Sequence, residues 1–161
     1  DRDKHIDIAI KACNILKVPL KIAGGVSDQK YKKYLESIAG PTIKFLNELK
    51  NNDSKKVNDL YSNAIAFIFT AKTDAFGITP VEAMAHGVPV IAYYGGGLKE
   101  TMIKNKTGIF YYQHDSLSLV NALKSFSTKK FDSKTIYNHA KKFGGERCMA
   151  EMKRYIQLVL I

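Results

Sequence analysis

The sequence predicts a doubly wound α/β fold, in which helices cover both faces of a parallel sheet. Short apolar runs alternate with amphipathic helical stretches as far as Ser116, after which the pattern is helical only. The apolar runs show little polar alternation, which is typical of parallel strands buried on both faces. No proline- or glycine-rich linker and no internal repeat divides the chain, so we expect one domain over residues 1–161.

The apolar runs are the predicted strands. They occupy residues 19–23, 42–46, 65–69, 88–93 and 108–111. In doubly wound sheets ligands bind outside the carboxyl ends of the strands. The loops after these runs are therefore where we look for function.

Helical periodicity separates the strands. The first helix has apolar residues at helical spacing from Ile6 to Leu16, with Cys13 as a small core residue. Asp28 and Ser54 are the predicted N-caps of the next two helices. The predicted helices after the first cover residues 28–37, 54–63, 80–86, 98–104 and, at the end of the chain, 146–160.

The last helix carries an apolar stripe. Its members are Met149, Met152, Tyr155, Ile156 and Val159. The stripe fits two arrangements equally well: it closes the core of this domain, or it packs against another domain.

The excess of basic residues indicates which kinds of binding partner to expect. Lys and Arg total 25 against 15 for Asp and Glu, a formal charge of +10. Solvated lysines account for much of this excess, but a positive field also attracts nucleoside diphosphates or an anionic membrane surface. We expect no nucleic-acid partner, because no basic stretch carries interleaved aromatics. With no apolar run of membrane-spanning length and no signal peptide, a cytoplasmic location is expected, and peripheral binding at the inner face of the membrane stays open.

Metal and dinucleotide sites are not expected. Asp1 and Asp3 imitate an Asp-x-Asp metal motif, but they do not follow a strand, and the four histidines show no ligand spacing. After Gly95-Gly96-Gly97, Glu100 stands where a dinucleotide fingerprint requires glycine. The sequence thus predicts no metal and no cofactor.

The most informative segment follows the third strand. It reads Thr-Asp-Ala-Phe-Gly-Ile-Thr-Pro-Val-Glu-Ala-Met-Ala-His-Gly-Val-Pro-Val-Ile-Ala over residues 73–92. Thr79 is a suitable N-cap, Pro80 suits the first helical position, and Glu82 completes a capping box. Gly87 should end the helix as its C′ residue. The amides at this helix start form a natural seat for phosphate.

This segment resembles the signature of the retaining GT-B glycosyltransferases of family 4, the glycosyl transferases group 1. The resemblance covers residues 4–156. It implies a Rossmann-like domain that forms the C-terminal, nucleotide-sugar-binding half of a two-domain enzyme. The acceptor-binding half and the first strand of this domain are expected to lie before Asp1, so the chain alone should bind the donor without transferring the sugar.

The resemblance assigns roles to individual residues. Asp74 lies where the family places an acidic group beside the donor sugar, and it is the implied catalytic residue, although most members have glutamate there. Glu82 is implied to bind the ribose hydroxyls, and it could do so while capping its helix. The implied donor-binding set comprises Lys4, Phe76, Gly77, Ile78, Thr79 and Glu82.

Each remaining member of this set has an implied contact. Lys4 should neutralise the diphosphate, Phe76, Gly77 and Ile78 should offer backbone amides, and Thr79 should add a hydroxyl. A side chain at residue 77 would obstruct close approach of the donor to the backbone.

The same resemblance suggests a reaction. It implies retaining transfer of a hexose, with mannose the closest match, from a nucleoside-diphosphate sugar to a glycan or lipid-linked acceptor in surface-polysaccharide assembly. Two alternatives stay open. Another GT-B protein, such as an epimerase or phosphorylase, would show different acidic, histidine or lysine motifs. A binding module that has lost catalysis is also consistent with aspartate at residue 74.

Overall fold

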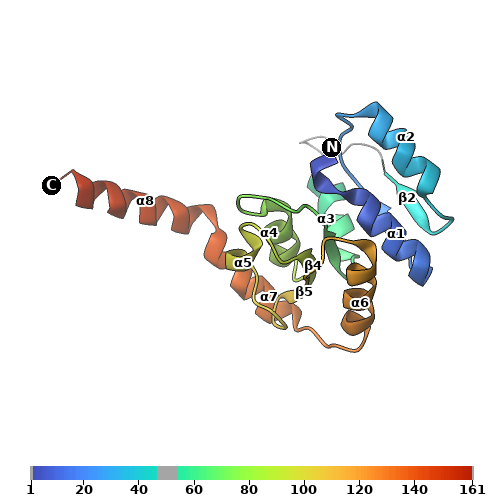
Figure 1. The fold of residues 1–161 in the computed structure, drawn as a ribbon. Coiled ribbons are helices and arrows are strands. Elements are labelled where there is room, and N and C mark those ends of the chain that lie inside the picture. The colour runs from blue at the N-terminus through green and yellow to red at the C-terminus, as the bar shows by residue number, and fades with distance from the viewer. Residues whose placement is uncertain (1, 47–53, 161) are drawn as a thin grey trace.

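The computed structural model describes residues 2–46 and 54–160, in which helices and strands alternate along the chain (Figure 1). The strands are β1 (Leu20–Ile22), β2 (Ile43–Phe45), β3 (Phe67–Phe69), β4 (Val90–Tyr93) and β5 (Gly108–Tyr111). The helices are η1 (Arg2–Lys4), α1 (Ile6–Leu16), α2 (Gln29–Ile38), α3 (Ser54–Ser62), α4 (Ile78–Ala85), α5 (Leu98–Thr101), α6 (Ser116–Ser127), α7 (Ser133–Ala140), η2 (Lys141–Phe143) and α8 (Gly145–Val159). Each predicted strand contains an observed one.

All strand pairs are parallel, as predicted, but they form two sheets. β1 pairs with β2, and β3, β4 and β5 pair in that order. Among the described residues β1 and β3 share no ladder. Leu20 and Ile68 nevertheless pack against the same two clusters of core residues. Side-chain packing therefore joins the sheets where backbone hydrogen bonds do not.

Helices cover both faces of the larger sheet, which confirms the doubly wound arrangement. Along β4, Val90 and Ala92 point into the core on the side of α4 and α7, while Ile91 points into the core on the side of α1 and α6. This alternation follows from the two-residue period of a strand. All three side chains are fully buried, which explains why the run lacks polar residues.

The helix boundaries agree with the sequence where short-range signals decide them. Asp28 is the N-cap of α2, because its carboxylate accepts a hydrogen bond from the Tyr31 amide at 2.9 Å. Cys13 is buried, as predicted, and burial raises the pKa of its thiol to about 11. Ser54 lies within α3 rather than ahead of it, and the residues before it are outside the described part of the chain.

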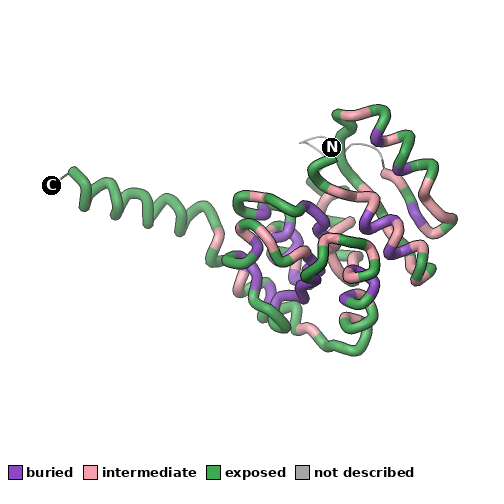
Figure 2. The backbone as a smooth tube through the Cα atoms, in the orientation of Figure 1, coloured by how far each residue is buried: buried purple, intermediate pink, exposed green. Residues whose placement is uncertain are grey.

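α8 extends away from the rest of the molecule (Figure 1) and is exposed along its whole length (Figure 2). None of its residues is buried, and Met149, Met152 and Tyr155 are among its exposed apolar side chains. The interpretation that the stripe closes this domain's own core is therefore wrong. Within the described residues no helix is long and apolar enough to cross a bilayer.

Candidate functional site

The predicted site residues gather at the carboxyl end of β3. The chain leaves β3 through Thr70 and forms a loop that ends at Gly77, where α4 begins. η1 lies against the same end, because the Thr70 hydroxyl donates a hydrogen bond to the Lys4 carbonyl at 2.6 Å. Residues 66 positions apart in the sequence thus meet where the topology rule for parallel sheets places ligands.

The Asp74 carboxylate organises this loop. One oxygen accepts hydrogen bonds from the Gly77 amide at 2.7 Å and the Phe76 amide at 3.2 Å. The other faces the Lys4 ammonium at 3.3 Å. Burial raises the pKa of Asp74, but the two amides and Lys4 outweigh it and hold the pKa below its ordinary value. Asp74 is therefore an anion that is bound within its own loop.

This geometry determines which amides of the loop are free to bind an anion. The Phe76 and Gly77 amides, expected to face a donor, donate to Asp74 in this structure. The amides of Ile78 and Thr79 lie in the first turn of α4, where amides have no acceptor within the helix. Both residues are exposed. The part of the loop that remains open to an anion is thus the first turn of α4 together with Lys4.

The start of α4 differs from the prediction. The helix begins at Ile78, and its N-cap is Gly77, whose backbone is left-handed with φ of 80°. Thr79 is therefore not the N-cap and Pro80 is not the first helical residue. Asp74 bends the preceding loop so that the helix starts earlier, and Pro80 still fits because its nitrogen needs no acceptor in the first turn.

Glu82 consequently forms no capping box. Its carboxylate accepts a hydrogen bond from the Tyr61 hydroxyl of α3 at 3.3 Å, and the side chain is exposed. Burial, and then the charge of Glu82, raise the pKa of Tyr61. The Tyr61 ring stacks on His86, whose Nδ1 lies 2.9 Å from the Glu82 carbonyl. His86 thus contacts both α3 and the last turn of its own helix.

A glycine turn after β4, at residues 95–97, packs against the backbone of the Asp74 loop. A Cβ at Gly96 would lie 2.3 Å from the Asp74 carbonyl oxygen, and one at Gly97 would lie 2.3 Å from the Ala75 oxygen. The Gly97 amide donates to the Asp74 carbonyl at 2.8 Å. Close backbone packing therefore requires glycine at both residues.

Two histidines belong to the same region, and the sequence reasoning missed them. His114, just after β5, lies 2.8 Å from the Thr70 carbonyl through Nε2, and its ring meets His5 edge-on at 4.5 Å and Tyr93 at 4.8 Å. Metal-ligand spacing alone does not reveal such a histidine. The position of His114 beyond a strand end was the signal that could have identified it.

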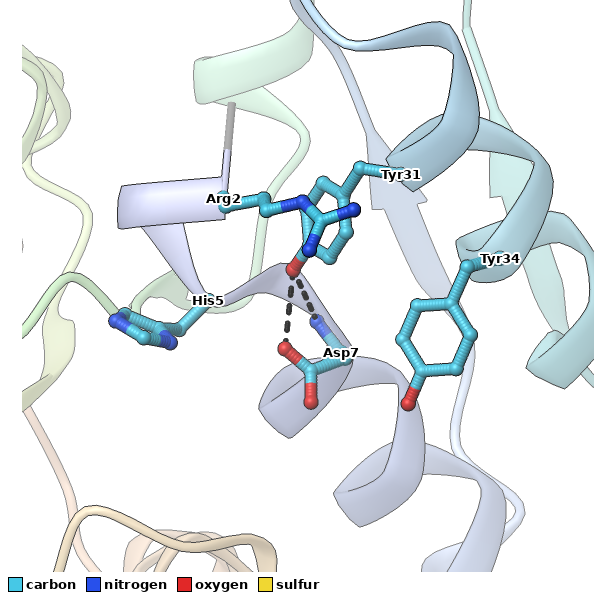
Figure 3. Close-up of a pocket in the computed structure, with 5 residues that line it drawn as sticks. All are labelled: Arg2, His5, Asp7, Tyr31 and Tyr34. Atoms are coloured by element: carbon cyan, nitrogen blue, oxygen red, sulfur yellow. Dashed lines mark hydrogen bonds between the residues drawn. The ribbon is translucent and has the colours of Figure 1, made fainter.

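A hollow of about 550 Å³ lies beside this region, between η1, α1 and α2 (Figure 3). Three of its lining residues are already paired: the Tyr31 hydroxyl donates to Asp7 at 3.0 Å, and the Arg2 guanidinium donates to Asp28 at 2.9 Å. Burial raises the pKa of Asp7, but hydrogen bonds from Lys11 and Tyr31 hold it below its ordinary value. Among the described residues no group of three or more His, Cys, Asp or Glu could hold a metal ion.

Solved structures share this architecture. Sucrose-phosphate synthase from Thermosynechococcus elongatus superimposes with a TM-score of 0.82 over 99% of this chain and 43% of its own, at 24% identity. HepE from Anabaena, solved in complex with UDP and glucose, gives 0.75 over 100% and 46%, at 21% identity. The chain therefore has the parallel α/β fold found in the GT-B glycosyltransferases.

Sequence comparison defines the family. The chain belongs to the glycosyl transferases group 1, which it matches over residues 1–143. The human alpha-1,3/1,6-mannosyltransferase ALG2 is 26% identical over 100% of this chain and 44% of its own length. Its counterpart in Dictyostelium discoideum is 29% identical over 67% of this chain and 31% of its own length. The chain thus spans less than half the length of these relatives.

Proposed function

We propose that this chain is the donor-binding half of a retaining glycosyltransferase. The whole protein would transfer a hexose, mannose as the names of its ALG2 relatives suggest, from a nucleoside-diphosphate sugar to a glycan or lipid-linked acceptor in surface-polysaccharide synthesis. The observation that carries the proposal is the pairing of Lys4 with Asp74 beside the open first turn of α4. A cation and helix amides at one strand end suit a diphosphate.

In this proposal Lys4 changes partner when the donor binds. Its ammonium leaves the Asp74 oxygen at 3.3 Å and turns to the diphosphate, which the Ile78 and Thr79 amides and the Thr79 hydroxyl bind from the other side. These contacts stabilise the negative charge that develops on the departing nucleoside diphosphate. The proposal invokes no metal, because Lys4 and the helix amides neutralise the diphosphate. It invokes no cofactor either, because the nucleotide sugar is a substrate.

Asp74 has two functions in this scheme. One carboxylate oxygen keeps the Phe76 and Gly77 amides in place, and so shapes the loop around the donor. The other, once released by Lys4, accepts a sugar hydroxyl beside the reacting carbon. The short aspartate suits the first function, since its oxygen reaches an amide only three residues away.

Glu82 is proposed to bind the ribose. Its side chain is exposed, and the Tyr61 hydroxyl engages only one of its oxygens. The other oxygen can accept hydrogen bonds from ribose hydroxyls, which are charge-assisted because the carboxylate is ionised.

We also propose that the preceding part of the whole protein supplies a strand between β1 and β3, and beyond it the acceptor domain. Leu20 and Ile22 of β1, like Phe67 and Ile68 of β3, are apolar but only half-buried, and each strand has an edge without a ladder among the described residues. A strand with an unpaired edge is a template for another strand. The second domain would orient the acceptor hydroxyl, a contribution of about 7–11 kcal/mol that this chain alone lacks.

The test of donor binding is a thermal-shift series with nucleoside diphosphates and their hexose derivatives, using the chain and its Lys4→Ala and Lys153→Ala variants. At about 100 times its dissociation constant a donor should add roughly 2.7 kcal/mol of stability. Lys4→Ala should weaken the shift, and Lys153→Ala, on α8, should not. If no nucleotide sugar shifts melting at millimolar concentration, the donor site is not here.

A binding module without catalysis is the second candidate, because Asp74 is already occupied by its own loop. Kinetics of the full-length protein with Asp74→Glu and Asp74→Ala separate the two. A transferase loses most turnover with alanine. A binding module has no turnover in any of the three forms.

A further inference from the structure

Two tyrosines and two lysines form a compact surface feature on the segment 94–112, which follows β4 and includes α5 and β5. The Tyr94 and Tyr112 rings lie 5.2 Å apart, centroid to centroid. The Lys99 ammonium lies 5.3 Å from the Tyr94 ring centroid, and the Lys104 ammonium 5.3 Å from that of Tyr112. We call these four residues the tyrosine–lysine patch.

The patch is firmly supported and open to solvent. The Tyr94 ring contacts the Phe110 ring of the core edge-on at 5.1 Å, so the tyrosine–lysine patch packs on the buried sheet. Tyr94 is 43% and Tyr112 50% exposed, and the neighbouring Ile103 is 38% exposed. Half-exposed tyrosines have an apolar ring and a polar hydroxyl, which suits the boundary between lipid chains and water.

The segment that carries the patch has a net positive charge. Between residues 94 and 112 the sequence has three lysines, at 99, 104 and 106, against the single Glu100. Lysines attract an anionic lipid surface, while the adjacent tyrosines enter the headgroup layer. We propose that the tyrosine–lysine patch docks this domain on anionic phospholipid membranes.

A second copy of the chain fits the patch less well. A symmetric dimer through this surface would bring the patch against itself, and Lys99 and Lys104 would meet lysines of the same kind. The formal charge of +10 adds long-range repulsion between copies. An anionic bilayer satisfies the same lysines and accepts the tyrosine rings.

Docking through the patch has a consequence for the donor loop. Tyr94 is followed directly by the glycine turn, and the Gly97 amide is bonded to the Asp74 carbonyl at 2.8 Å. Docking therefore places the Asp74 loop beside the membrane surface. Where the proposed function holds, this orientation suits an acceptor carried by a lipid, but docking itself does not depend on that function.

The experiment is vesicle co-sedimentation of the full chain without any donor. Vesicles of phosphatidylcholine alone are compared with vesicles of equal parts phosphatidylcholine and phosphatidylglycerol. We expect binding to the anionic vesicles only, weakening as ionic strength rises from about 0.1 M to about 0.5 M. Lys99→Gln with Lys104→Gln should lower the affinity about 25-fold, or about fivefold for each lysine. Tyr112→Ser should lower it further without changing the charge.

The matched control is Lys129→Gln with Lys130→Gln, which removes the same charge between α6 and α7 and should change affinity less than about twofold, because electrostatic attraction falls off within a Debye length. Equal losses in both double variants would show attraction by net charge alone and overturn the proposal. So would a loss caused by Met152→Glu on α8 but not by the patch variants. Absence of binding to anionic vesicles at low ionic strength would refute it as well. A dimer without vesicles that the Lys99 and Lys104 changes dissociate would assign the patch to a second copy.

Discussion

Asp74 and Glu82 belong to one sequence signature, yet the structure gives them opposite surroundings. Asp74 is half-buried, holds two amides of its own loop and pairs with Lys4. Glu82 is exposed and accepts one long hydrogen bond, at 3.3 Å, from Tyr61. Removal of Asp74 leaves amides without an acceptor, whereas removal of Glu82 leaves a hydroxyl that water can reach.

The two acids of this motif therefore serve different ends, Asp74 the stability of the fold and Glu82 the binding of a ligand. Asp74 should matter to the folded state even when no ligand is present. Glu82 should matter almost entirely when a ligand is bound. Each of the following experiments tests that division.

The largest effect on stability is expected in the glycine turn that packs against the Asp74 loop. Gly96→Ala places a Cβ 2.3 Å from the Asp74 carbonyl oxygen, at a residue with φ of 53°. Overpacking and left-handed strain together should lower the free energy of unfolding by about 2–4 kcal/mol. Gly145→Ala is the control, because nothing lies within 4 Å of its Cβ, and it should change stability by less than about 1 kcal/mol. Similar denaturation midpoints for both variants would mean that the turn does not constrain the loop.

The next effect is on ligand binding at Glu82. Glu82→Gln keeps the shape but removes a charge-assisted hydrogen bond, so nucleotide affinity should fall by about 1.5–3 kcal/mol. Since Glu82 caps no amide, the melting temperature of the free protein should hardly change, even with alanine. Calorimetric titration and thermal melting measure both. A variant that binds normally but melts much lower would reverse the roles given to the two acids.

A smaller effect is expected from Asp74→Ala in the absence of ligand. The Phe76 and Gly77 amides lose their acceptor, as in the loss of a helix cap, which should cost about 1–2 kcal/mol. Asp74→Asn retains an acceptor oxygen and should recover much of this loss. Urea denaturation distinguishes the three proteins. Equal stability of wild type and Asp74→Ala would remove Asp74 from the folded-state half of the comparison.

The smallest effect is a pH dependence. The pKa of Asp74 is lowered in the folded state, so the unfolded chain binds protons more readily at this residue. The stabilisation by Asp74 is therefore complete above the unfolded pKa of about 3.9 and is lost as pH falls below it. The stability difference between wild type and Asp74→Asn should shrink between about pH 5 and pH 2. A difference that stays constant over this range would contradict an ionised, bound Asp74.

Sequence patterns located the elements well and the details of the site less well. The apolar runs placed each strand, and the Asp28 side chain placed the start of α2, because both signals act within a few residues. The helix α4 begins two residues earlier than predicted, because another set of hydrogen bonds competes with the predicted capping box. Thr79 and Glu82 satisfy a short-range rule, but in the structure the Asp74 carboxylate accepts hydrogen bonds from the amides of Phe76 and Gly77, ahead of the helix.

Other features depend on contacts between distant segments. The contact between Thr70 and Lys4, and the edge-on contact of His5 with His114, are not encoded in any local spacing. The division into two sheets depends on which strands share edges, and an apolar run does not specify its neighbours. The resemblance pointed to the loop after β3, while the orientation of Asp74 within that loop depends on its contacts with Phe76, Gly77 and Lys4.

α8 has a consequence for how the chain behaves over time. Its 15 residues have no buried side chain, so the rest of the molecule contributes little to holding the helix together. A helix of this length is marginal in water by itself, and it should open locally without disturbing the core. We expect its amides to exchange with deuterium far sooner than those of β4, and limited proteolysis to remove it first. The domain and its last helix are then separate units of stability, which a single melting temperature would not reveal.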